Sequence, residues 1–147
     1  MKHTPNKIRE DKLWQGVLEL VQVIYGHIDD IITRFPSEEW ATASKLRNSA
    51  IDSLFYVSQA VGSAYPEMNQ YDLSNARKNL FSLQTMYIFA AKQKFIELDP
   101  ELILKIDALL ALIDKRLSVS ETEKEKKNKE ELEPWLEKYR LWREMQG

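Results

Sequence analysis

Apolar residues recur at three- and four-residue spacing through most of the first 117 positions of the chain, which is the spacing of one face of an α-helix. Four such stretches are separated by breaks that contain proline or runs of polar residues. The pattern predicts helices at about 11–33, 37–62, 73–97 and 100–117. Short connections make successive helices antiparallel neighbours. The expected fold is therefore all-α, an antiparallel up-and-down four-helix bundle.

Residues typical of helix ends mark the first two helices. The first is expected to stop near Phe35 and Pro36, because the residue before a proline is disfavoured in the helical conformation. Ser37 is the expected N-cap of the second helix, and Trp40 is the first residue of its apolar stripe.

The second half of the bundle is delimited in the same way. Residues 63–71 contain Pro66 and are predicted to form a loop. Asp99 followed by Pro100 is a strong start signal for the fourth helix, since aspartate caps and proline is accepted at the first helical position.

The third predicted helix is apolar over more than one face. Its aromatic residues, which are more often core than a base-stacking platform, are Phe81, Tyr87, Phe89 and Phe95. A helix that is apolar nearly all round is either central in its fold or covered by another subunit. This surplus apolar surface predicts homo-oligomerisation.

The chain ends in a segment of different composition. Residues 118–131 are rich in charged residues and are expected to form a linker or an exposed helix, and 132–147 an amphipathic helix with Pro134 in its first turn. The apolar side of this last helix consists of Leu132, Trp135, Leu136, Tyr139 and Trp142. This stripe is expected to pack back on its own bundle, to dock onto a neighbouring subunit, or to dock onto a separate partner.

Composition and charge exclude several classes of site. The chain has no cysteine, so disulfides and thiolate chemistry are excluded. Residues 1–10 form a polar extension without a leader-like apolar run, and no stretch is long enough to span a membrane, so a cytoplasmic protein without membrane contact is expected. Residues 1–117 carry 14 Lys and Arg against 15 Asp and Glu, and neither this part nor the remainder is basic overall.

Residues suited to catalysis or metal binding do not converge in this pattern. There are only two histidines and no glycine-rich phosphate loop, and adjacent carboxylates such as Asp29 and Asp30 point about 100° apart on a helix. We therefore expect a non-enzymatic protein without a cofactor or metal.

Two arginines are the more informative polar residues. Arg47 falls on the apolar arc of the second predicted helix, whereas Lys45 points to the opposite side. An arginine on such an arc requires a partner or an aliphatic stem that reaches water. Arg47 is either a structural residue, in an ion pair or simply at the edge of the stripe, or a residue that faces a subunit or ligand. Arg77 on the third helix allows the same two interpretations.

The order of these signals resembles a known superfamily over about residues 11–117. The residues that carry the resemblance are Trp14, Gln15, Ile24, Tyr25, Phe35, Pro36, Glu38, Glu39, Leu46, Arg47, Ala50, Ala76, Arg77, Leu80 and Leu83. The chain resembles the four-helix-bundle superfamily of the ribosomal-RNA intervening-sequence proteins and the accessory variability determinant proteins of diversity-generating retroelements, and is more similar to the second group.

This resemblance implies a ring-shaped homopentamer that binds a reverse transcriptase and nucleic acid, either RNA or DNA. Arg47 and Arg77 fall on the arginine motifs of the second and third helices of the superfamily, and Lys45 and Lys78 lie beside them as further candidates for nucleic-acid binding. The alternative is a protein–protein adaptor whose outer face or C-terminal helix docks a partner without nucleic acid.

Overall fold

The computed structural model describes residues 5–63 and 66–146; the side chains at 5–7, 66–68, 120–133, 135 and 136 lie outside this description. Over the described residues the chain is all-α. Its elements are α1 (Pro5–Glu10), α2 (Lys12–Arg34), a short 3-10 helix η1 (Pro36–Glu38), α3 (Thr42–Gly62), α4 (Pro66–Lys92) and α5 (Pro100–Gln146). The predicted fold class is confirmed.

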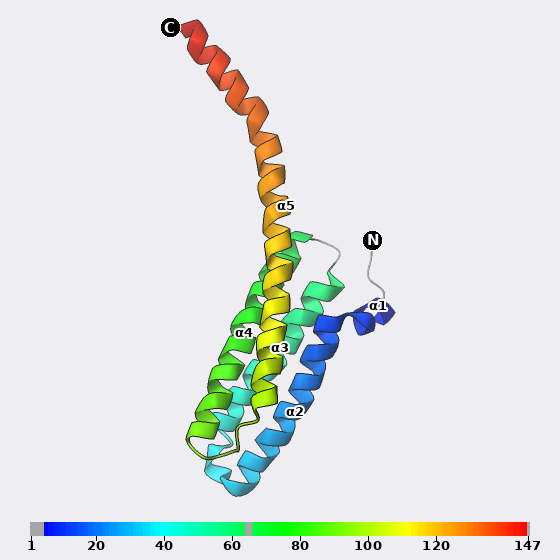
Figure 1. Cartoon of the computed structure of the whole chain (residues 1–147), viewed down its shortest axis with the longest axis vertical. Coiled ribbons are helices and arrows are strands. Elements are labelled where there is room, and N and C mark those ends of the chain that lie inside the picture. The colour runs from blue at the N-terminus through cyan, green and yellow to red at the C-terminus, as the bar shows by residue number, and fades with distance from the viewer. Residues whose placement is uncertain (1–4, 64–65, 147) are drawn as a thin grey trace.

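Four long helices form the body of the molecule. Helix α3 packs against α2 and α4, and α5 packs against α4 and α2. In Figure 1 the chain runs down α2, up α3, down α4 and up α5, with α5 in front and α3 behind it. The seam between α2 and α3 therefore lies on the opposite side of the bundle from the seam between α4 and α5.

The two aspartate caps account for the starts of α2 and α5. The Asp11 side chain accepts hydrogen bonds from the backbone N–H groups of Leu13 (2.9 Å) and Trp14 (3.1 Å). The Asp99 side chain accepts one from the N–H of Glu101 (3.0 Å). Each carboxylate satisfies donors that have no partner within the helix. The predicted starts near Asp11 and at Pro100 are confirmed.

The predicted start of the second helix was wrong. Pro36 opens η1, and α3 begins only at Thr42. Glu38, rather than Ser37, serves this helix start, because its carboxylate accepts from the Thr42 backbone N–H (3.3 Å) and hydroxyl (2.8 Å). Trp40 therefore lies in the turn before α3 and is 82% exposed, not on a buried stripe.

Both ends of α4 also differ from the prediction. Residues 66–71 are helical rather than a loop, because Pro66 occupies the first position of α4, where its missing N–H costs nothing. The helix ends at Lys92 instead of 97. Lys94 adopts a left-handed conformation (φ 64°), and the N–H groups of Lys94 and Phe95 bond to the carbonyls of Ala91 (3.0 Å) and Ala90 (3.0 Å). This is a Schellman C-cap, formed here without glycine.

The core is a single apolar cluster with contributions from all four long helices. Tyr87 is its largest fully buried side chain, and its hydroxyl accepts a hydrogen bond from the backbone N–H of Asp99 (2.8 Å). Gly16 lets α5 come close to α2, since a Cβ atom at this position would lie 2.6 Å from Leu109 Cδ2. These contacts fix where α5 starts and how it lies on the bundle.

Beyond the bundle, α5 continues as one helix to Gln146. The prediction left residues 118–131 as a linker or an exposed helix; their backbone is helical. Pro134 lies inside this helix and not in the first turn of a separate one, which corrects the prediction. Residues 118–146, here called the arm, project away from the bundle (Figure 1). Within the described part of the chain, no helix is both long and apolar enough to cross a membrane.

Candidate interaction surfaces

Arg47 lies on the side of α3 that faces α2. Ser58, eleven residues and about three turns later, accepts a hydrogen bond from Trp14 Nε1 of α2 (3.0 Å), so this side of α3 follows the α2 seam. Arg47 is half-buried there. Among the described residues it has no ion-pair or hydrogen-bond partner, so a structural ion pair is not what holds it at this seam.

Arg77 is placed differently, on the side of α4 that faces α5. Its Nε lies 2.6 Å from Asp114 Oδ1, and both side chains are about half exposed. A second link along the same seam runs from Gln84 Nε2 to Asp107 Oδ1 (2.7 Å). For Arg77, then, the structural ion pair is present.

Lys45 and Lys78 lie on a third side, between α3 and α4. Lys45 lines a cavity of about 430 Å³ together with Met86 and Phe89 of α4. Lys78 precedes Phe89 by eleven residues, about three turns, and so shares its side of α4. Both lysines are exposed. We call this surface the α3–α4 face; its members are Lys45, Tyr71, Lys78, Phe89 and the adjoining Lys92.

The four predicted nucleic-acid-binding residues thus do not form one patch on a single subunit. Arg47 lies at the α2–α3 seam, Arg77 at the α4–α5 seam, and Lys45 and Lys78 lie on the α3–α4 face. Sequence spacing could not show this, because it places a residue on its own helix but does not say which neighbour that side meets.

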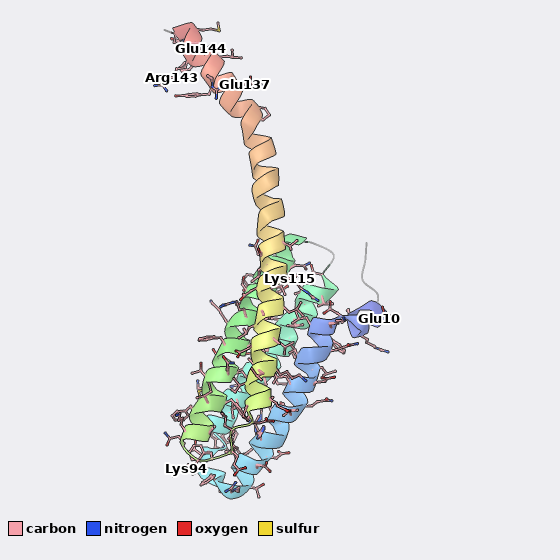
Figure 2. All side chains as sticks on the ribbon, viewed as in Figure 1. Glu10, Lys94, Lys115, Glu137, Arg143 and Glu144 are labelled. Carbon is pink, nitrogen blue, oxygen red and sulfur yellow. The ribbon has the colours of Figure 1, made fainter. Side chains whose placement is uncertain are left out.

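The arm exposes part of its predicted apolar stripe to solvent. The rings of Tyr139 and Trp142 stack on each other with centroids 6.2 Å apart, and each side chain is more than half exposed. Leu132, Trp135 and Leu136, the other members of the stripe, have side chains outside the described part. In Figure 2, Glu137, Arg143 and Glu144 lie at the far end of the arm, well away from Lys115 and Lys94 on the bundle. Tyr139 and Trp142, the described members of the stripe, do not pack on the bundle.

The aromatic residues of the third predicted helix divide into two groups. Tyr87 is buried, and Phe95 is half-buried against Phe35 with ring centroids 5.0 Å apart. Phe81 and Phe89, in contrast, are exposed, so the interpretation of these two as core residues was wrong. They belong to the outer surface of α4, which leaves its extra apolar side chains uncovered in the single chain.

Exposed apolar side chains gather along the two opposite seams of the bundle. Along the first, which we call the α2–α3 face, Ile51 and Phe55 are exposed, and Trp14, Leu18, Tyr25 and Arg47 lie half-buried beside them. Along the second, the α4–α5 face, the exposed apolar side chains are Phe81, Ile88, Leu104 and Ala111, and the polar residues Gln84 and Asp107 lie among them. Ile51, Phe55 and Leu104 were missed from the sequence, although each is a large apolar residue that falls outside the buried stripe of its helix.

A polar cleft lies at the base of the bundle. It has a volume of about 840 Å³ and is lined by polar residues that include His27, Asp30, Arg34, Lys94 and Glu97. Charges of both signs are mixed along its walls. No group of three or more His, Asp or Glu side chains within the described residues is arranged as a metal site.

Comparison with known proteins identifies no relative: no family model matches the chain, and neither a curated protein nor a solved structure shows significant similarity to it.

Proposed function

We propose that this chain is a non-enzymatic accessory protein that assembles with copies of itself and docks a protein partner through its arm. The observation that carries the proposal is the exposed aromatic pair, Tyr139 and Trp142, near the end of a helix that leaves the bundle. Aromatic side chains bury about 150–250 Å² each when packed, so their exposure leaves a large apolar area in water. A helix that presents such side chains at its tip suits the groove of another protein.

The resemblance noted in the sequence supports the rest of the proposal. In that superfamily the accessory proteins form homopentameric rings and bind a reverse transcriptase. A reverse transcriptase is therefore the partner class that we propose for the arm. The exposed apolar side chains on the two opposite seams supply the surface that self-association would cover.

Truncation after Val119 tests the role of the arm. If the arm serves a separate partner, the truncated chain keeps the thermal stability of its bundle and its mass per assembly in light scattering. It no longer retains a retroelement reverse transcriptase on co-expression, whereas the full chain does. Double substitution of Tyr139 and Trp142 by serine should do the same, while Glu137→Ser and Lys138→Ser, on the same part of the helix, form the matched control. Retention of the enzyme by the truncated chain would refute this role.

Nucleic-acid binding is a second candidate, favoured by the α3–α4 face. Lys45, Lys78 and Lys92 are exposed there beside the exposed rings of Tyr71 and Phe89. Lysines neutralise phosphates, and aromatic rings stack on unpaired bases. An assembly would repeat this face once in every subunit, which would multiply the local positive charge.

A salt titration separates this candidate from an adaptor that binds protein alone. Affinity for structured RNA or single-stranded DNA should fall steeply with salt, because bound lysines release counterions from phosphates. The double variant with Lys45→Glu and Lys78→Glu should lose binding, and Lys115→Glu, on the exposed side of α5, should not. No binding of the unaltered protein at low salt would leave only the adaptor.

A further inference from the structure

Self-association needs a surface, and the bundle offers two unlike ones on opposite sides. We propose that copies of the chain associate head to tail, with the α2–α3 face of one copy packed against the α4–α5 face of the next. This inference rests on the assembly proposed above and adds which surfaces meet. Its occupant is a second copy of this chain.

The apolar content of the two faces is comparable. Ile51 and Phe55 on the α2–α3 face are 44% and 54% exposed, and Phe81 and Leu104 on the α4–α5 face are 56% and 66% exposed. Helical spacing aligns each set with its seam. Phe55 precedes the seam residue Ser58 by three positions, and Phe81 precedes the seam residue Gln84 by three. Each face therefore has large apolar side chains beside a polar contact between its two helices.

Charge complementarity favours a second copy as the occupant. Arg47 is half-buried on the α2–α3 face and has no anionic partner among the described residues. On the α4–α5 face, Asp107 accepts one hydrogen bond, from Gln84, and a carboxylate has room for several more. A guanidinium that reaches this carboxylate across an interface would acquire the partner that it lacks within its own chain.

The two charges also lie at similar heights along the bundle. Lys45 of α3 and Phe89 of α4 line the same cavity, and these helices are antiparallel, so Arg47 lies level with Tyr87 of α4. Gln84, which binds Asp107, follows one turn further up, about 5 Å away. Parallel copies placed side by side therefore bring Arg47 of one near Asp107 of the next, with only a small shift along the axis.

The same charges disfavour a two-fold symmetric dimer. Such a dimer pairs one surface with itself, so Arg47 of one copy would not meet Asp107 of the other, because the two residues lie on different faces. Pairing of unlike faces brings the two charges together and leaves one free face at each end, so that further copies add until the assembly closes. Because the copies are parallel, their arms all project from the same end.

Single-face variants test the pairing. Phe55→Asp places a charge on the α2–α3 face, and Phe81→Asp places one on the α4–α5 face; both side chains are exposed, so the fold should tolerate the changes. Each variant alone should be monomeric in light scattering. An equimolar mixture should form a 1:1 dimer of about 35 kDa and stop there, since each variant retains one intact face and these two faces are complementary. Tyr71→Asp, on the α3–α4 face, is the control that should assemble as the unaltered chain does.

A charge exchange provides a second, independent readout. Arg47→Asp and Asp107→Arg should each weaken assembly, and the two changes together in one chain should restore it. A monomeric unaltered protein would overturn both this inference and the proposed assembly. If the unaltered protein assembles but Phe55→Asp and Phe81→Asp have no effect, or if the mixture fails to form the dimer, only the head-to-tail pairing is overturned.

Discussion

The hydroxyl of Tyr87 is a sensitive point of the fold, because it joins the core to the start of α5. It is fully buried on α4 and accepts a hydrogen bond from the Asp99 backbone N–H (2.8 Å), in the residue that caps α5. Tyr87→Phe removes this oxygen and keeps the ring that packs against His27, with centroids 5.3 Å apart. The change isolates the hydrogen bond from the apolar packing.

The expected loss follows from the two partners. A net hydrogen bond contributes about 0.5–1.5 kcal/mol, and a donor left without an acceptor costs more when water cannot reach it. Asp99 is exposed, so water can replace the lost acceptor. Tyr87→Phe should therefore lower the free energy of unfolding by about 1 kcal/mol, or roughly 3 °C in a chain of this size. Tyr87→Ala should cost about 3–5 kcal/mol, since it also leaves a cavity.

Chemical denaturation of the unaltered protein and of both variants, at neutral and at alkaline pH, measures these losses of stability and their pH dependence. Burial raises the pKa of Tyr87 above its ordinary value of 10.0. Above that ordinary value the unfolded chain loses the proton while the folded chain keeps it, so this tyrosine destabilises the fold as pH rises. The advantage of the unaltered protein over Tyr87→Phe should therefore shrink at alkaline pH. An equal or greater stability of Tyr87→Phe at neutral pH would refute the role assigned to this hydrogen bond.

Three further changes have expected outcomes. Arg77→Ala and Asp114→Ala should show a coupling of at most about 1 kcal/mol in a double-mutant cycle by urea denaturation, because the pair is half exposed; a coupling of several kcal/mol would contradict this. Asp72→Asn should raise the melting temperature at neutral pH, because burial raises the pKa of Asp72 and its charged form therefore costs stability. This gain in melting temperature should fade as the pH drops through that pKa, and a gain independent of pH would point to another cause. Pro134→Ala should increase the helical signal in the circular dichroism spectrum, because proline inside a helix removes a backbone hydrogen bond and costs up to about 3 kcal/mol. An unchanged spectrum would show that the arm already accommodates the proline.

The sequence was most informative where one residue type has one local role. Asp11 and Asp99 cap helices through their own side chains, so their positions follow from chemistry within three residues. Ser37 has the right chemistry for a cap, yet the chain forms a 3-10 turn from Pro36 onward. The side chain that accepts a hydrogen bond from Thr42 at the start of α3 is therefore Glu38. Which residue serves the start of α3 depends on the path of the chain between α2 and α3, and the chemistry of Ser37 alone does not contain this path.

Surface positions were harder to foresee for a related reason. A helical pattern shows that Phe81 and Phe89 lie away from the narrow stripe of Leu80 and Leu83, but not whether another helix covers them. The bundle has only four long helices, and both side chains point outward from α4. In the same way, the ion pair of Arg77 depends on the register of α5 against α4, which the sequence of α4 alone does not contain.

Helix α5 is at once one wall of the core and the whole of the arm, and this makes it a lever. Its first part is held by the contact of Tyr87 with Asp99 and by the ion pairs of Lys105 with Glu19 (2.8 Å) and Arg116 with Asp11 (3.1 Å). The arm is longer than the anchored part, at about 43 Å against 27 Å for the rise of a helix of these lengths. If a bound partner displaced the tip of the arm, the α2–α5 contact at Gly16 would experience a smaller shift and a larger force. Docking at the tip would thus be mechanically coupled to packing in the bundle.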